Sequence, residues 1–277
     1  MGKTLLDVKI LYDKMGHAEK KIADFILEHP TGLVPLSITE LADKCGCGEA
    51  TIVRFARRLG FNGYQQLKIS LVQEENVPTA TDCIKEGDSL EEVYNKVASD
   101  VYCSLEKTKK VLDYSALREV GKKILSAKTI YIMGSGSSAS IAIDASHKFL
   151  RLGINATAVT DSHMQAITSA HADKDSVIIG ISHSGSSINI VEALELGRKN
   201  GATTIAITSY GKSPIDKVSD YILHTISDEI NYSILGLNSR IAQLTIIDTL
   251  YYYLLKHLPN AKLLTNKTEN ALLDKKF

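Results

Sequence analysis

The chain of 277 residues is 44% hydrophobic and 23% charged, which is ordinary for a globular protein and long enough for two domains. Its 32 basic residues balance its 32 acidic ones, so a nucleic-acid or membrane partner must be sought in local patterns. No apolar run approaches the roughly 20 residues that span a bilayer, and the charged N-terminus lacks the apolar core of a signal peptide. We therefore expect a cytoplasmic protein without a membrane partner.

The N-terminal segment predicts two helices. The first covers residues 1–15, which are amphipathic, and ends near Gly16. The second covers residues 18–28, and Pro30 with Gly32 ends it.

A helix-turn-helix pattern follows. Ser37 and Glu40 form an S-x-x-E capping box, Gly46 ends the short helix that begins there, and a second helical pattern runs from Ala50 to Leu59. Ala42 falls where two crossing helices need a small side chain, and Gly46 falls at the turn, where φ is often positive. The expected inward positions are Leu41, Cys45, Cys47, Ile52 and Phe55.

The cysteines are expected to be free thiols. Cys45, Cys47, Cys83 and Cys103 have no matching histidine cluster and lie in a chain without a secretion signal. The inward positions of Cys45 and Cys47 account for both without a metal.

The second helix of the pattern begins a locally basic stretch. Residues 50–73 contain Arg54, Arg57, Arg58 and Lys68 and no acidic residue. Arginines on a helix are often only a solvated surface, and paired helices are common in bundles, but the inward pattern favours binding of double-stranded operator DNA. We expect Lys68 to contact a phosphate only. The expected DNA contacts are Ser37, Glu49, Thr51, Arg54, Arg57, Arg58 and Lys68.

The sequence ATIVRFARRLGFNGY at residues 50–64, preceded by the capped helix, closely resembles the N-terminal domain of RpiR/MurR transcriptional regulators. One departure is Gly48, because the family often carries Ser or Thr at the start of the recognition helix. Glycine can occupy a helix N-cap but supplies no side-chain acceptor. This departure weakens the case for a phosphate contact at this position.

A polar segment from Glu74 to Asp88 lacks periodicity and is interpreted as a linker. We place the domains at residues 1–76 (all-α helix-turn-helix), 77–88 (linker) and 89–277 (α/β). A second capping box, Ser89 and Glu92, precedes a long helix that we expect to pack against the second domain or a second subunit. Its apolar positions are Leu90, Val93, Tyr94, Val97, Val101 and Leu105.

Two apolar strands each lead into a serine-rich loop and then into a helical pattern. The strand 129–133 precedes Gly-Ser-Gly-Ser-Ser at 134–138, and the strand 177–181 precedes Ser-His-Ser-Gly-Ser-Ser at 182–187. Helix N-termini favour anions, and serine hydroxyls add donors, although such turns often only cap a helix. Because the construction occurs twice, we expect a phosphate site. A dinucleotide is less favoured, since Ala139 replaces the third glycine of G-x-G-x-x-G, and we assign no cofactor.

These loops resemble those of the SIS domain, a phosphosugar-binding α/β module, over about residues 117–258, and the second loop is similar to the signature SxSGxT/S. The resemblance implies phosphate contacts from Ser138, Ser182, Ser184 and Ser187, with backbone groups around Gly136 and Gly185. The other expected effector contacts are Ser137, His183, Ser186 and Glu229. RpiR/MurR regulators join the two domains in this order, which implies control of carbohydrate-metabolism genes by a phosphorylated sugar or amino sugar.

The remaining pattern alternates strands with helices. Strands are expected at 156–160, 204–208 and 221–226, and helices at 117–125, 164–171 and 190–198. Such alternation predicts a parallel sheet with ligands at the carboxyl ends of its strands, and the SIS resemblance implies a flavodoxin-like fold. A last helix at 241–258 is apolar on more than one side, so we expect it at the interface of a dimer or tetramer.

An enzyme is the alternative, because SIS domains also occur in phosphosugar isomerases. Such chemistry requires a general base, and the candidates are Glu229, His163 and His183. The histidines show no mutual metal spacing. Because an isomerase has no use for a DNA-binding half, we expect a regulator without catalytic residues.

Overall fold

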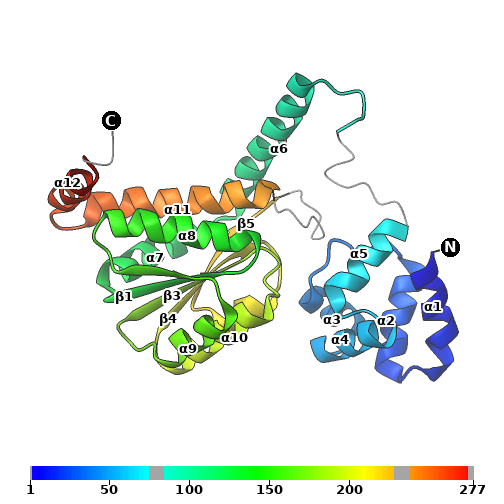
Figure 1. The fold of residues 1–277 in the computed structure, drawn as a ribbon. Helices are drawn as coiled ribbons and strands as arrows, with labels where there is room; N and C mark the ends of the chain where they lie inside the picture. The colour runs from blue at the N-terminus through cyan, green and yellow to red at the C-terminus, as the bar shows by residue number, and fades with distance from the viewer. Residues whose placement is uncertain (1, 75–83, 228–236, 274–277) are drawn as a thin grey trace. The chain divides into compact units, whose positions relative to one another are not determined.

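The computed structural model describes residues 2–74, 84–227 and 237–273, which form two compact units (Figure 1). One unit consists mainly of residues before Asp100, and the other mainly of residues after it. Each has apolar core clusters of its own. The predicted fold class, an all-α unit followed by an α/β unit with a parallel sheet, is confirmed. None of the helices in the described ranges combines the length and apolar character needed to cross a bilayer.

The first unit is helical and closes around one core. Its elements are α1 (Lys3–Leu11), the 3-10 turn η1 (Tyr12–Lys14), α2 (His17–Glu28), α3 (Ile38–Cys45), α4 (Glu49–Arg58) and α5 (Tyr64–Glu74). The buried side chains of Ile22, Leu41, Phe55 and Leu67 come from four different helices. Helix α2 begins one residue before the predicted helix 18–28, and α4 begins and ends one residue before the predicted helix 50–59. Helix α5 was not predicted.

The predicted capping box and turn define the geometry of α3 and α4. Ser37 Oγ accepts from the backbone N–H of Glu40 at 3.1 Å, and the Glu40 carboxylate accepts from that of Ser37 at 2.8 Å. Gly46 ends α3 with φ of +58°, a left-handed conformation that a residue with a Cβ adopts at a cost. Ala42 is buried. The helix-turn-helix arrangement is therefore confirmed.

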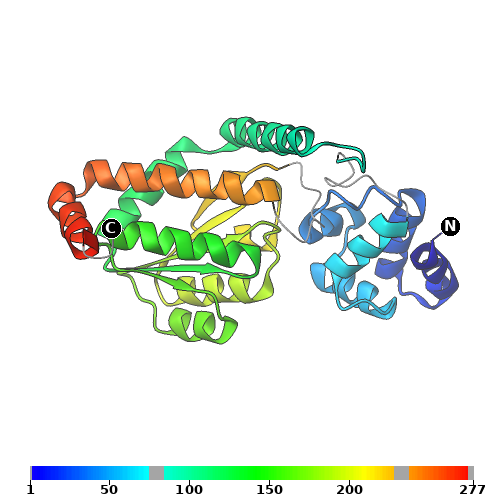
Figure 2. The same cartoon turned by 45° about the horizontal axis from the view of Figure 1, so that its top comes forward.

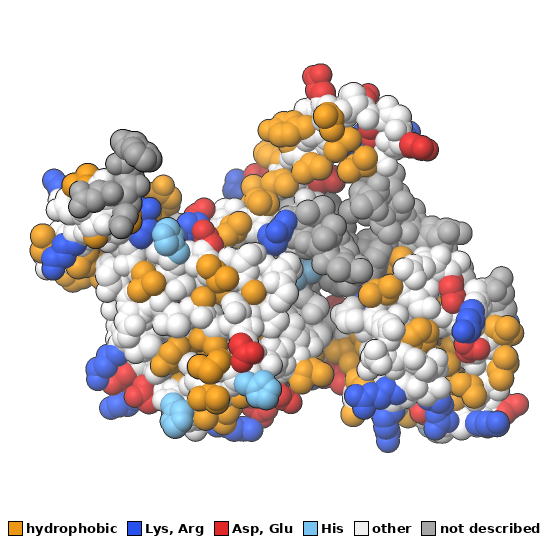
Figure 3. Space-filling model, viewed as in Figure 1, with side chains coloured by type: hydrophobic (Ala, Val, Ile, Leu, Met, Phe, Trp, Pro, Cys, Tyr) orange, Lys and Arg blue, Asp and Glu red, His pale blue; other side chains and the backbone are white. Residues whose placement is uncertain are grey.

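Helix α6 (Leu90–Val111) extends from residues of the first unit into the second. In its C-terminal half, the Thr108 hydroxyl donates to the backbone oxygen of Ile226 at 3.2 Å and accepts from its N–H at 2.9 Å. In its N-terminal half, Leu90 is 88% and Tyr94 72% exposed, and apolar side chains lie on its surface (Figure 3). The expected packing of this half of α6 against the second domain or a second subunit stays a prediction.

The second unit is a parallel sheet between helical layers. Its strands, β1 (Thr129–Gly134), β2 (Ala156–Val159), β3 (Ser176–Ser182), β4 (Thr203–Ser209) and β5 (Tyr221–Thr225), lie in the order β2-β1-β3-β4-β5. All neighbouring pairs are parallel. The helices are α7 (Tyr114–Ser126), α8 (Ser137–Arg151), α9 (Ser162–Ala170), α10 (Ile188–Lys199), the 3-10 turn η3 (Pro214–Val218), α11 (Leu237–His257) and α12 (Ala261–Leu272).

Helices cover both faces of the sheet, as Figures 1 and 2 show. One core cluster joins the sheet to α7, α8 and α11, and a second joins it to α10 and η3. In α11, Ile246, Ile247, Leu250 and Leu254 are buried, and the helix contacts α7 and α8. Packing within the unit accounts for these four side chains, whereas Ile241 and Tyr252 of the same helix are exposed. The oligomer interface on this helix stays a prediction. The helix is apolar on more than one side because it contacts two helices of its own unit as well as β5.

Candidate functional site

Helix α4 exposes a basic face and buries an apolar one. Ile52, Phe55 and Ala56 lie in the core, while Arg54, Arg57 and Arg58 are exposed. Lys and Arg side chains gather along one edge of this unit (Figure 3, blue). This helical segregation places the three predicted arginines on one surface, as binding to a phosphate backbone requires.

Two other predicted DNA contacts lie at helix starts. Ser37 is the N-cap of α3 and is partly buried. Glu49, the first residue of α4, accepts a hydrogen bond from the hydroxyl of Thr39 at 2.7 Å. This bond joins α3 to α4 and therefore helps to orient α4.

Lys68 is not on this surface. Its side chain is fully buried, and its Nζ donates to the backbone oxygen of Leu36 at 2.8 Å, an acceptor that it shares with the Tyr64 hydroxyl at 3.0 Å. Burial lowers the pKa of Lys68 to about 8, and the Glu40 carboxylate opposes this effect. The predicted phosphate contact of Lys68 is wrong, because α5 turns this residue toward the core beside Leu67.

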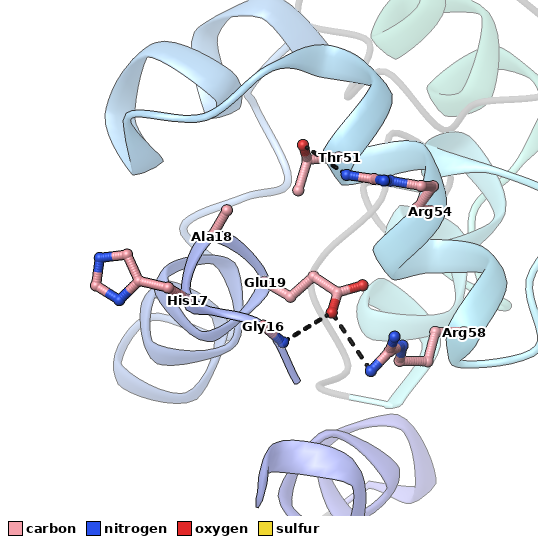
Figure 4. A pocket seen from close by; sticks show the side chains of 7 residues that line it. All are labelled: Gly16, His17, Ala18, Glu19, Thr51, Arg54 and Arg58. Atoms are coloured by element: carbon pink, nitrogen blue, oxygen red, sulfur yellow. Dashed lines mark hydrogen bonds and ion pairs between the residues drawn. The ribbon is translucent and has the colours of Figure 1, made fainter. Parts of the chain in front are cut away.

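A polar hollow of about 430 Å³ lies next to α4 (Figure 4). Arg54 donates to the Thr51 hydroxyl at 3.4 Å, so this guanidinium is held near the hollow. The lining residues are Gly16, His17, Ala18, Glu19, Thr51, Arg54 and Arg58. The contributions of α2 and its N-cap were missed in the sequence, because only folding brings the start of this helix to α4.

Arg58 is held by two partners from the segment before and within α2. Its Nη1 donates to the backbone oxygen of Lys14 at 2.7 Å and lies 3.4 Å from the Glu19 carboxylate. That carboxylate also accepts from the N–H of Gly16 at 3.1 Å (Figure 4). Glu19 thus bridges the start of α2 and a predicted DNA contact.

In the second unit, the two serine loops begin at neighbouring strand ends. β1 and β3 are hydrogen-bonded along their length, with Gly134 in register with Ile181. β2 flanks β1 and β4 flanks β3, so the strand order reverses between the two loops. Open parallel sheets bind ligands at such a switch point. Topology therefore brings together two loops that are far apart in the sequence.

The loops leave the starts of α8 and α10 without a side-chain cap. Gly136 is the N-cap of α8, and both it and Gly185 have positive φ, of +57° and +62°. Ser187 is the N-cap of α10, but its Oγ lies 3.0 Å from Ser182 Oγ and accepts no bond from its own helix. Two helix N-termini with positive partial charge therefore meet serine hydroxyls at one edge of the sheet.

Hydrogen bonds within the second loop hold its turn. The N–H of Gly185 donates to the backbone oxygen of Ser182 at 3.1 Å, and that of Ser186 donates to Ser184 Oγ at 3.3 Å. Ser138 and Ser182 are buried, Ser137 is exposed, and the remaining serines of the second loop are partly buried. The Ser184 hydroxyl thus combines a fixed backbone with partial access to solvent.

An amide network links the two loops, and the sequence did not reveal it. Asn189 Nδ2 donates to Ser135 Oγ at 2.8 Å and to Gln165 Oε1 at 2.6 Å. Gln165 is fully buried, and its Nε2 donates to the backbone oxygens of Val159 at 2.9 Å and Gly134 at 3.3 Å. These side chains from α9 and α10 therefore tie the two loops to each other and to the end of β2.

The remaining predicted residues of the effector site and of the enzymatic alternative are Glu229, His183 and His163. Glu229 lies outside the described residues. His183 is partly buried, and its backbone oxygen accepts from the N–H of Ser209 at 3.0 Å. His163 is exposed on α9. In the described parts of the chain, no three His, Cys, Asp or Glu side chains are arranged to hold a metal ion.

The two units match two family models. Residues 2–77 match the helix-turn-helix domain of the rpiR family, and residues 123–253 match the SIS domain. An uncharacterized HTH-type transcriptional regulator of Caldanaerobacter subterraneus is 36% identical over 253 residues, which cover 91% of this chain and 90% of that protein. The HTH-type transcriptional regulator HexR of Pseudomonas aeruginosa is 33% identical over 252 residues, covering 90% and 88%.

A solved structure has the same fold over nearly the whole chain. It is the NanR protein of Vibrio vulnificus complexed with ManNAc-6P, with a TM-score of 0.84 and 21% sequence identity. The match covers 99% of this chain and 100% of that one.

Proposed function

Because the chain belongs to the RpiR family of helix-turn-helix transcriptional regulators, we propose that it binds operator DNA through α3 and α4 and that a phosphorylated sugar or amino sugar controls this binding. The observation that carries the proposal is the meeting of both serine loops at the switch point of the sheet. DNA binding is assigned to residues 1–76 and effector binding to residues 89–277, with the linker at 77–88.

The chemistry of the loops supports a phosphate group as the bound part of the effector. Hydroxyl and backbone N–H donors form charge-assisted hydrogen bonds to phosphate oxygens, and the starts of α8 and α10 add favourable dipoles. Ser138, Ser182, Ser184 and Ser187 are the proposed phosphate contacts, with Ser137, His183, Ser186, Glu229 and the backbone at Gly136 and Gly185 around them. The NanR structure, which carries a sugar phosphate, supports this effector class.

Control of DNA binding requires that the effector bind two states of the protein unequally. The proposed effector site and the proposed DNA surface belong to different units. We therefore propose that the effector controls DNA affinity by changing the position of one unit relative to the other.

The enzymatic alternative is less well supported by the described residues. Aldose–ketose isomerisation needs a general base beside the sugar carbons, and His163 is exposed on α9. The helix-turn-helix unit has no role in such a reaction. We therefore propose a regulator rather than an enzyme.

Arg54→Ala and Arg57→Ala are each expected to weaken operator binding about tenfold or more, because one base-reading pair contributes about 1 to 3 kcal/mol. Lys9→Ala is the matched control, since Lys9 is an exposed basic residue on α1. The measurement is a gel-shift titration with duplexes enriched from a random pool by the wild type. Operator affinity unchanged in both arginine variants would contradict the assignment of α4.

The protein is expected to be a dimer or tetramer. A helix-turn-helix unit makes few base contacts and gains specificity from two half-sites about one helical turn apart. Sedimentation at micromolar concentration, with and without DNA, measures the assembly. A monomer in both conditions would contradict this prediction.

A further inference from the structure

The hollow beside α4 contains a carboxylate where DNA binding calls for cations. Arg54 and Arg58 line it from α4, and Glu19 lines it from α2. The Glu19 side chain is 12% exposed and that of Arg58 is 40% exposed. The carboxylate is thus largely sheltered, whereas the guanidinium remains accessible from outside.

Glu19 and a DNA phosphate would make the same kind of bond to Arg58. A guanidinium binds carboxylate and phosphate oxygens through similar charge-assisted hydrogen bonds. As long as Glu19 pairs with Arg58, this arginine adds little net positive charge to the surface.

We propose that Glu19 competes with a DNA backbone phosphate for Arg58, and that the hollow between the start of α2 and α4 receives this phosphate. The Lys14 backbone oxygen continues to hold Arg58 when the phosphate replaces the carboxylate, and Arg54 and Thr51 line the other side. Glu19 thereby weakens the sequence-independent part of DNA binding. This inference rests on the proposed DNA binding by α3 and α4.

Glu19→Gln tests the competition with little change in shape. Glutamine retains an oxygen that accepts from the N–H of Gly16, so the start of α2 keeps its capping bond. The full chain is titrated with a labelled duplex of random sequence by fluorescence anisotropy, over a series of salt concentrations. The variant is expected to bind about three- to tenfold more tightly at low salt. When log affinity is plotted against log salt concentration, the slope for the variant is expected to be more negative than that of the wild type by about 0.9. This difference corresponds to one additional phosphate neutralised.

Two controls separate competition from a general charge effect. Glu28→Gln removes one negative charge from the exposed end of the same helix and should change affinity little. In an Arg58→Gln background, Glu19→Gln should produce no gain. Thermal melting verifies that each variant is folded, and Glu19→Ala replaces Glu19→Gln if the latter is unfolded.

The outcomes distinguish this inference from the proposed function. If the wild type binds the duplex but Glu19→Gln behaves like Glu28→Gln, binds more weakly, or still gains affinity without Arg58, the competition is refuted and DNA binding stands. If the wild type shows no salt-dependent binding to any duplex, both proposals fail.

Discussion

Substitution of Ser184 by alanine is expected to weaken binding of the phosphorylated effector by one to two decades without changing the DNA affinity of the protein alone. A hydroxyl that donates to a phosphate contributes about 1.5 to 3 kcal/mol. Ser184 is partly accessible, and its loop is also held by the backbone bond from Gly185 to Ser182, so the turn should persist in the variant. A panel of sugar phosphates and amino-sugar phosphates, screened by thermal shift on the wild type, identifies the effector for this measurement.

The control for this variant is Ser140→Ala. Ser140 is an exposed serine of α8 whose hydroxyl donates to the backbone oxygen of Ser137 at 2.7 Å, and it is not among the proposed contacts. Because effector binding and DNA binding are coupled, loss of effector binding should also remove the response of DNA binding. The DNA-binding curve of Ser184→Ala should therefore be unchanged at effector concentrations that shift the DNA-binding curves of the wild type and Ser140→Ala. A response of Ser184→Ala at the wild-type concentration would contradict the assigned site. Aldose–ketose interconversion by the wild type that Glu229→Gln abolishes would establish the enzyme instead.

Lys68→Ala is expected to destabilise the first unit by about 2 to 4 kcal/mol, whereas Lys68→Met should change its stability by less than about 1.5 kcal/mol. Alanine leaves a cavity where a long, fully buried side chain lay. Methionine retains most of that volume, and the Leu36 oxygen keeps its bond from the Tyr64 hydroxyl. Urea unfolding, with hydrogen exchange of α4 and α5 to localise the change, measures the two effects.

The pH dependence of the same unfolding provides an independent check. The pKa of Lys68 is about 8 in the folded chain and about 10.4 in an unfolded one, so between these values the unfolded chain binds the additional proton. The contribution of Lys68 to stability therefore rises as pH increases from 8 to 10.4, on the order of 2 kcal/mol in total. Lys68→Met should lack this rise. If Lys68→Met instead reduces the salt dependence of DNA binding while stability is unchanged, the buried role is refuted.

Local chemistry in the sequence was sufficient to locate the helix-turn-helix and the two serine loops. The Ser37–Glu40 capping box and the glycine at the end of α3 depend on residues within one turn of each other, and the structure confirms them. The strands that precede the serine loops were recognisable because a buried parallel strand is a short apolar run. The parallel sheet followed from the alternation of strands and helices.

Errors arose where an interpretation required the packing partner of a helix. Lys68 was assigned to DNA because its stretch is basic, but α5 packs this position against the core. For α11, the structure shows that Ile246, Ile247, Leu250 and Leu254 pack within their own unit, and an oligomer interface on this helix stays a prediction. Composition shows that a helix has apolar or basic positions, but it does not show which neighbour each position meets.

The sequence by itself determined the two fold classes, the helix-turn-helix and the serine loops, because each depends on hydrophobic periodicity, capping and turn chemistry over a few consecutive residues. Only the tertiary structure decided that Gln165 and Asn189 tie the two loops together, and that Glu19 pairs with Arg58. These contacts join residues from different helices and loops. They depend on how those elements pack on the core of their own unit, and no short stretch of the chain contains this information.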